Sequence, residues 1–250
     1  CKAGKPLFTE KPLSRTLEQS HEAIRLVEES GIVAQIGFVR RYCPDWGEYR
    51  RLIEADVIGT PVVWWMAGGG APPRSPFFSK HNQGGGPMLD AMVHNFDFCR
   101  YIWGDPVRIE GSMVNLSPKA DSLDSGSALM EFPGGHRHTI LMTWGMPDGV
   151  SASGLHCAFG PKGVFHFSDP DDTPPEGLDA DNQRYFVTIH EGGERRVHVY
   201  DTWNMYEAQL EDFVKKAEAG DRNTRATITD GLRAQEIGLA VLGEFTPGER

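Results

Sequence analysis

The stretch KPLFTEKPLSRTLEQSHEAIRLVEESGIVAQIGF, residues 5–38, decides the fold class at the start of this chain. Residues 5–10 are predicted to form an apolar strand, and a Thr-x-x-Gln capping box at Thr16 then starts a helix. Gly31 stands where a left-handed residue ends such a helix, and the apolar run 32–38 is a second strand. Strand, helix and strand in this order indicate the βαβ unit of a parallel sheet with a right-handed crossover.

The rest of the chain changes its apolar period from helix to strand and back. Helices are predicted at 45–54 and 88–103, and between them lie a strand at 62–66 and a long loop at 67–87. A period of two then predicts a largely antiparallel sheet, and two helices close the chain. The sheet strands are expected at 108–116, 125–132, 136–144, 155–159, 164–167, 185–190 and 195–200, and the last helices at 205–219 and 229–245. In the first of these helices, Leu210, Phe213, Val214 and Ala217 are expected to face inward.

Composition excludes several classes of partner. The chain has 250 residues, with 25 Lys and Arg against 35 Asp and Glu, so its formal net charge is −10. Nucleic acids and anionic membranes are bound by clustered Lys and Arg, so neither is expected as a partner. No apolar run approaches the roughly 20 residues that cross a bilayer. The acidic stretch 169–172 is expected to be a solvated loop.

The four cysteines and the first residue bear on compartment and completeness. Cys1, Cys43, Cys99 and Cys157 are far apart and form no C-x-x-C pair, so reduced cysteines and a cytoplasmic location are expected. Because the chain begins at Cys1 with no Met, we expect that further sequence precedes it.

The predicted helix at 88–103 carries the side chains best suited to acid–base chemistry. Asp90, His94 and Asp97 stand at i, i+4 and i+7, so they are predicted to share one helix face. A carboxylate beside an imidazole stabilises the protonated ring and so raises the basicity of the neutral imidazole, which suits a general base. The alternative is a solvated face with an incidental charge pair. One His and two carboxylates do not make a metal site, so no metal is predicted.

Two strand ends deliver charged residues to the same edge of the predicted parallel sheet. Glu10-Lys11-Pro12 follows the first strand, where ligands bind in open parallel sheets. Lys11 would bring a positive charge to a sugar oxygen or a developing alkoxide, and the alternative is an exposed Lys before a helix. Arg40 and Arg41 follow the second strand. One of them is expected to pair structurally and the other to reach a ligand.

Glycines and histidines elsewhere leave more than one interpretation. The loop 67–87 favours an active-site lid over a linker, because a linker rarely carries two adjacent phenylalanines. The triple glycine 84–86 could seat an anion or act as a hinge. His136 and His138 are expected to be polar surface residues. No G-x-G-x-x-G occurs, so the usual phosphate-binding turn of a dinucleotide site is missing.

Three segments, taken in order, resemble a known family. AGKPLFTEKPL (residues 3–13) is similar to A-G-K-x-V-x-x-E-K-P-x, and GFVRRYCP (37–44) to G-F-N-R-R-F-x-P, with Val39 in place of Asn. GGGPMLDAMVHNFD (84–97) fits G-G-G-x-x-x-D-x-x-x-H-x-x-D. These patterns are typical of the glucose–fructose oxidoreductase and inositol dehydrogenase family, Gfo/Idh/MocA, and the resemblance covers essentially the whole chain.

The resemblance implies an α+β architecture in two parts. Residues 1–40 would be the C-terminal β-α-β edge of a truncated Rossmann domain that binds NAD or NADP. Residues 41–250 would be a substrate-binding and oligomerisation domain, with an open, mostly antiparallel sheet packed by helices. A homodimer or homotetramer formed through that sheet is expected. The segment 75–83 lacks the Trp-Arg pair that many members carry before the triple glycine, which leaves the substrate open.

The resemblance also assigns roles to individual residues. It implies oxidation of a CH–OH group of a sugar, inositol or related polyol by a nicotinamide cofactor, with the chain alone inactive. The expected catalytic residues are Lys11, Asp90 and His94; the cofactor would contact Glu10, Lys11, Pro12 and Arg41, and the substrate Lys11, Arg41, Asp90 and His94.

Two other functions stay open at this point. One keeps the cofactor without net redox, as a lyase or glycosidase that oxidises a sugar transiently. The other is a non-catalytic binding or assembly domain, for which loss of His94 or Lys11 would leave function intact.

Overall fold

The computed structural model describes residues 1, 3–168, 170–171 and 173–246. Its first part is the predicted βαβ unit: β1 (Leu7–Thr9) pairs in parallel with β2 (Ala34–Ile36), and α1 (Leu17–Ser30) connects them. The capping box at Thr16 is present, and Gly31 ends the helix at a φ of 65°. The local chemistry of the chain therefore places both helix ends as expected.

An eight-stranded sheet makes up most of the rest, in the order β10-β9-β8-β7-β3-β6-β5-β4. Only β3 and β6 pair in parallel among its described strands, so the prediction of an open, mostly antiparallel sheet is confirmed. The strands are β3 (Val63–Gly70), β4 (Arg108–Val114), β5 (Ser125–Glu131), β6 (Arg137–Thr143), β7 (Ser151–Gly160), β8 (Gly163–His166), β9 (Gln183–Ile189) and β10 (Arg195–Asp201).

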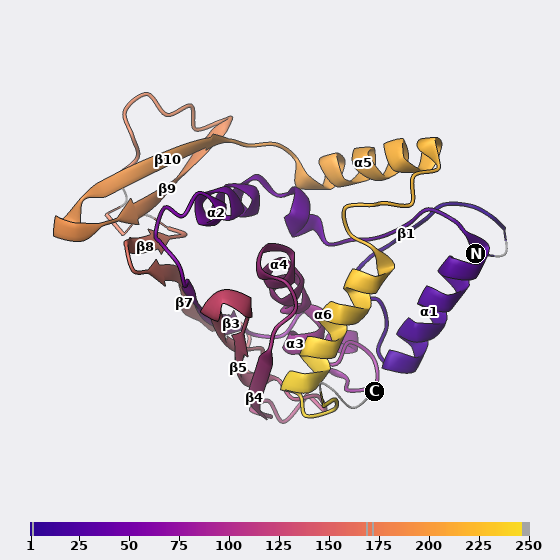
Figure 1. The fold of residues 1–250 in the computed structure, drawn as a ribbon. Coiled ribbons are helices and arrows are strands. Elements are labelled where there is room, and N and C mark those ends of the chain that lie inside the picture. The colour runs from indigo at the N-terminus through magenta and orange to yellow at the C-terminus, as the bar shows by residue number, and fades with distance from the viewer. Residues whose placement is uncertain (2, 169, 172, 247–250) are drawn as a thin grey trace.

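Helices lie on one side of this sheet (Figure 1), and the core lies between them and the strands. The α-helices are α2 (Pro44–Glu54), α3 (Pro87–Asp90), α4 (Val93–Trp103), α5 (Met205–Ala219) and α6 (Ile228–Val241). Short 3-10 turns are η1 (Val39–Tyr42), η2 (Pro76–Ser79), η3 (Pro133–Gly135) and η4 (Glu191–Gly193). The turn η1 leads directly from β2 into α2, so it joins the βαβ unit to the large sheet and its helices.

The two faces of the sheet differ in what covers them. Trp64 in β3 is fully buried, whereas its neighbour Trp65 is 46% exposed. Leu141 and Leu155 both pair with Ala67 across β6 and β7, and they are about half exposed. Because side chains alternate between faces along a strand, the residues around Trp65 mark an uncovered apolar face.

The strand β3 is longer than predicted. The glycines 68–70 lie within β3 and not in the following loop. A Cβ on Gly69 would collide with the backbone oxygen of Thr143 in the neighbouring strand. These glycines therefore allow close strand pairing, and the loop is confined to residues 71–86.

Of the four α5 residues predicted to face inward, two do so in the structure. Phe213 packs on Phe8 of β1 at a centroid distance of 5.5 Å, and Ala217 is partly buried. Leu210 and Val214, also expected to face inward, are each 49% exposed. The helix packs mainly over η1 and reaches β1 through Phe213, so Leu210 and Val214 stay on its exposed side.

The remaining predictions concern the cysteines, the acidic stretch, membrane-spanning helices and the domain boundary. Cys1, Cys43, Cys99 and Cys157 are all free thiols, and the last two are buried. The acidic stretch 169–172 lies partly outside the described residues. Within the described ranges, no helix combines the length and apolarity that a membrane span requires. The division at residue 40 stays a prediction.

Candidate functional site

Lys11 and Asp90, which are 79 positions apart in the sequence, meet at the carboxyl end of β1. Lys11 Nζ donates to the backbone oxygen of Asp90 at 2.8 Å and to its Oδ1 at 3.1 Å. Their side chains are 17% and 15% exposed, so the pair is shielded but reachable. The structure thus brings together two of the three predicted catalytic residues.

The loop after β2 closes against the same edge. Gly37 donates its backbone N–H to the oxygen of Thr9, and a Cβ at Gly37 would lie 2.8 Å from the Glu10 carboxyl group. A side chain at this position would displace the carboxyl group of Glu10. Glu10 is exposed and Pro12 is partly buried. Their expected contacts with a cofactor stay predictions.

His94 lies in the first turn of α4 with its ring largely enclosed. Its Nδ1 is buried and has no hydrogen-bond partner in the described structure. The Phe38 ring packs edge-on against the imidazole, with 6.2 Å between the ring centres. Burial lowers the pKa of His94 from its ordinary 6.5 to about 3, and the positive charges of Arg40 and Lys11 add to this effect. The imidazole is therefore neutral at pH 7, which leaves it able to accept a proton.

The predicted pairing of Asp90 with His94 is wrong in its details. The helix 88–103 is broken: α3 ends at Asp90, and α4 begins at Val93. The N–H of Met92 reaches back five residues to the oxygen of Pro87, which changes the phase of the helical face. No hydrogen bond or ion pair joins Asp90 to His94 within the described chain. The carboxylate neutralises Lys11 and does not raise the basicity of the imidazole.

Asp97, the third residue of the predicted face, points elsewhere. It is fully buried and accepts two hydrogen bonds from Arg41, from Nε at 2.9 Å and from Nη2 at 2.6 Å. Arg41 also contacts Asp230 at 3.2 Å. Burial raises the pKa of Asp97 to about 6, and Arg41 opposes that rise. Arg41 thus serves as a structural cation between two carboxylates, and its expected contact with a cofactor or substrate stays a prediction.

Arg40 is a charged residue near His94 that sequence reasoning left without a role of its own. Its Nη1 donates to the Oδ1 of Asn95 at 2.6 Å, and its guanidinium lies 4.3 Å from the centre of the Trp46 ring. Burial lowers the pKa of Arg40 to about 10. No carboxylate lies within ion-pair distance of it among the described residues. Arg41 is thus the paired arginine of the doublet, and the expected contact of the other with a ligand stays a prediction.

The triple glycine closes the loop 71–86 against the sheet. Gly86 has a φ of 84°, and a Cβ there would collide with the backbone oxygen of Leu123. A Cβ on Gly84 would approach the Cα of Phe78 to 2.7 Å. Close backbone packing therefore explains these glycines. The loop is also held from outside, since Arg15 bonds to both His81 and Glu244.

His136 and His138, both predicted as polar surface residues, lie in different surroundings. His138 is fully buried and stacks on Trp64 at 4.0 Å, so the prediction of a surface residue is wrong for it. His136 accepts a hydrogen bond from the backbone of Val62 at 3.1 Å. No group of three potential metal ligands occurs among the described residues.

Comparison with known proteins identifies the family of the chain. The family model described as "GFO/IDH/MocA C-terminal domain" matches residues 46–164. The chain is 40% identical to the scyllo-inositol 2-dehydrogenase (NAD(+)) of Bacillus subtilis over 40% of this chain and 29% of that protein. It is 33% identical to the rhizopine catabolism protein MocA of Rhizobium meliloti over 95% of this chain and 67% of that protein.

A solved structure shares the fold. A variant of a 3-ketoreductase from Actinomadura kijaniata, in complex with TDP-benzene and NADP, superimposes with a TM-score of 0.77 at 18% identity, over 98% of this chain and 72% of that one. The match to MocA extends over 95% of the chain. The chain belongs to the Gfo/Idh/MocA family of oxidoreductases.

Proposed function

We propose that the full-length protein is a nicotinamide-dependent dehydrogenase that oxidises a secondary alcohol of a sugar, an inositol or a related polyol. The observation that carries the proposal is the grouping of Lys11, Asp90 and a neutral His94 beside the carboxyl ends of two parallel strands. Ligands of open parallel sheets bind at that edge. The inositol dehydrogenase named among the relatives supports the substrate class.

The residues present fit a nicotinamide cofactor at this edge. Glu10, Lys11 and Pro12 leave β1 where such a cofactor would lie, and the shielded ammonium of Lys11 can donate to it or to the substrate. When bound, NAD or NADP would supply the acceptor for the hydride that leaves the alcohol carbon. The relative named with NAD(+) and the structure solved with NADP leave the choice between the two open.

The chain's own side chains would divide the remaining work. Lys11 donates a hydrogen bond to the reacting oxygen, and its charge stabilises the developing alkoxide. The ring of His94 accepts the hydroxyl proton through Nε2, because its Nδ1 is buried. Asp90 fixes the position of Lys11 and balances its charge. The low pKa of His94 favours rapid return of that proton to solvent.

We also propose that the uncovered sheet face joins copies of the chain into a homodimer or homotetramer. Trp65, Leu141 and Leu155 project from it, and an exposed apolar area of this kind marks a protein interface. Light scattering of the full-length protein and of its Leu141→Glu variant tests this. A smaller assembly is expected for the variant, and an unchanged mass would contradict the proposal.

A cofactor and polyol panel tests the dehydrogenase. The full-length protein is mixed with NAD⁺ or NADP⁺ and with inositols, aldoses and neutral glycosides, and absorbance of the reduced cofactor is followed. We expect polyol-dependent reduction of one cofactor. Cleavage of a glycoside without net reduction would instead identify a lyase or glycosidase, and no turnover of any kind would favour a binding domain.

A further inference from the structure

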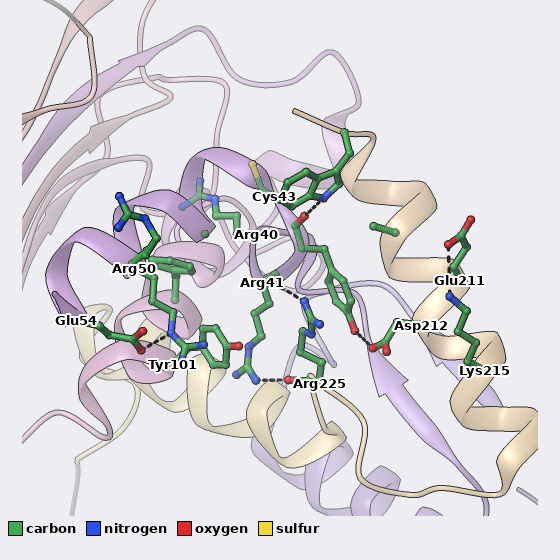
Figure 2. A pocket seen from close by; sticks show the side chains of 16 residues that line it. Arg40, Arg41, Cys43, Arg50, Glu54, Tyr101, Glu211, Asp212, Lys215 and Arg225 are labelled. Carbon is green, nitrogen blue, oxygen red and sulfur yellow. Dashed lines mark hydrogen bonds and ion pairs between the residues drawn. The ribbon is translucent and has the colours of Figure 1, made fainter. Parts of the chain in front are cut away.

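A second positively charged site lies outside the group around Lys11. A cavity of about 460 Å³ opens between η1, α2, α4 and α5 (Figure 2), and neither Lys11, Asp90 nor His94 lines it. Six cationic and three carboxylate side chains line this arginine cavity, in a chain whose net charge is −10. The cationic ones are Arg40, Arg41, Arg50, Arg51, Lys215 and Arg225, and the carboxylates are Glu54, Glu211 and Asp212.

The guanidinium groups are held in place by aromatic rings and by the backbone. Arg41 and Arg50 both lie over the ring of Tyr101, at 4.6 and 4.2 Å from its centre. Arg225 lies 4.5 Å from the centre of the Tyr42 ring. Arg41 and Arg225 each donate to the other's backbone oxygen, at 2.6 and 3.2 Å. Three like charges are thus fixed near one another before any ligand arrives.

Carboxylates already pair with most of these cations. Arg41 contacts Asp97 and Asp230, and Arg50, Arg51 and Lys215 pair with Glu54, Glu48 and Glu211. Within the described residues, no carboxylate lies within ion-pair distance of Arg225. The nearby Asp212 instead accepts a hydrogen bond of 2.6 Å from the hydroxyl of Tyr42. Arg225 is therefore a cation of this cavity that lacks a carboxylate partner, which an anionic ligand would supply.

The walls would also accommodate an organic group. Trp203 lines the cavity beside Tyr42, and its indole N–H is fixed on the backbone oxygen of Tyr42 at 2.8 Å. The indole is 55% exposed, so it offers a rigid apolar surface at the entrance. The volume falls within the range of about 300 to 1,000 Å³ that small-molecule sites occupy.

We propose that the arginine cavity binds the phosphate or carboxylate group of a small molecule, at a site separate from the one around Lys11. Guanidinium groups bind such oxyanions with paired, charge-assisted hydrogen bonds. Arg225 and Arg50 are the side chains placed to meet the anion, and Trp203 would contact the organic part.

Calorimetry with the full-length protein tests this site. Inorganic phosphate, glucose 6-phosphate and glucose are titrated in turn at low salt, with NAD⁺ present so that a cofactor site is filled. We expect saturable binding of the two phosphate-bearing probes, and glucose, a candidate ligand of the site around Lys11, should not compete with phosphate. Equal affinity for the two would identify the anion alone as the ligand, and at least tenfold tighter glucose 6-phosphate would identify a phosphorylated molecule.

Matched variants decide the location. Arg225→Gln and Arg50→Gln should each weaken phosphate binding at least tenfold, whereas Arg25→Gln on the exposed face of α1 should leave it unchanged. Thermal melts check that each variant is folded. Replacement of Arg50 is the less disruptive of the two for folding, because its side chain on α2 is partly exposed. Unchanged phosphate affinity in both folded variants would overturn the proposal. So would a failure of the unmodified protein to saturate below about 10 mM phosphate, a limit of the order used for weak ligands.

Discussion

The site around Lys11 and the arginine cavity are built on the same two elements but carry charge differently. η1 and α4 contribute to both, since α4 bears His94 toward one and Phe98 and Tyr101 toward the other. At the first site one ammonium meets one carboxylate at 3.1 Å beside a neutral imidazole. In the second, cationic side chains outnumber carboxylates.

This difference separates two kinds of ligand chemistry. A balanced ion pair beside a neutral base suits an uncharged hydroxyl, whose proton must be taken up during the reaction. Fixed and unbalanced guanidinium groups suit a ligand that is already an anion. The two sites can therefore be disturbed one at a time.

Replacement of His94 by Ala should have the largest effect, and only on one side of the comparison. Loss of a general base typically costs roughly 10²- to 10⁴-fold in turnover. We expect that drop in kcat of the full-length enzyme, with phosphate affinity of the arginine cavity unchanged. His21→Ala, an exposed change on α1, is the control. An unchanged kcat in the His94 variant would remove its catalytic assignment.

Asp97→Asn should instead damage both sites, because it removes the buried partner of Arg41. Arg41 and Asp97 have side-chain exposures of 5% and 0%. Breaking a buried pair commonly costs about 3–5 kcal/mol when the remaining charge is left without a partner. Because Arg41 keeps Asp230 at 3.2 Å, we expect a loss near the lower end of this range in the free energy of unfolding measured with urea.

The matched control for that change is Asp105→Asn. Asp105 pairs with Arg100 but is 61% exposed, so its loss should cost less than about 1 kcal/mol. An equal loss of unfolding free energy in the two variants would show that another partner is enough to hold Arg41. The pair of Arg41 and Asp97 would then not be needed to support either site.

Local chemistry made part of this architecture predictable. The cap at Thr16 and the glycine at position 31 act within a few residues, so their effect can be deduced from the sequence alone. The alternation that separates Trp64 from Trp65 is equally local. By contrast, the glycines 68–70 predicted a loop, because the strand that requires them, around Thr143, lies far away in sequence.

The site shows the same limit more sharply. Spacing placed Asp90, His94 and Asp97 on one face, but the helix break at Met92, where an N–H reaches back five residues, separates Asp90 from the other two. Their partners, Lys11 and Arg41, come from distant segments that periodicity does not connect. Only the order of the motifs indicated that Lys11 and Asp90 belong together.

Acid should destabilise the protein through His138, which is buried in β6 beside Trp64 of β3. Burial lowers its pKa from 6.5 to about 3, so below pH 6.5 the unfolded chain takes up a proton that the folded chain refuses. His138 should therefore contribute a fall of about 1.4 kcal/mol per pH unit to the free energy of unfolding between these two values, and His94 and His156, whose pKa values burial also lowers to about 3, add to it. Urea unfolding at pH 7.5, 6 and 5 measures the slope. His138→Phe should reduce it by that amount, whereas His21→Phe should not, and an equal slope in all three proteins would contradict the burial of a neutral ring.

The smallest expected effect concerns Arg40, the residue that faces both regions. Burial is the chief cause of the low pKa of His94, and the charge of Arg40 is the next one. Arg40→Met should therefore raise the pKa of His94, by less than about one unit, since the larger cause remains. The acid limb of kcat/KM should lie well below pH 6.5 in the unmodified enzyme, because the proposed base stays deprotonated there, and in the variant it should move toward higher pH. Arg40→Lys retains the charge and should leave the limb in place. Identical profiles for the Met and Lys variants would show that the field of Arg40 does not reach the base, and the two regions would then be electrostatically independent.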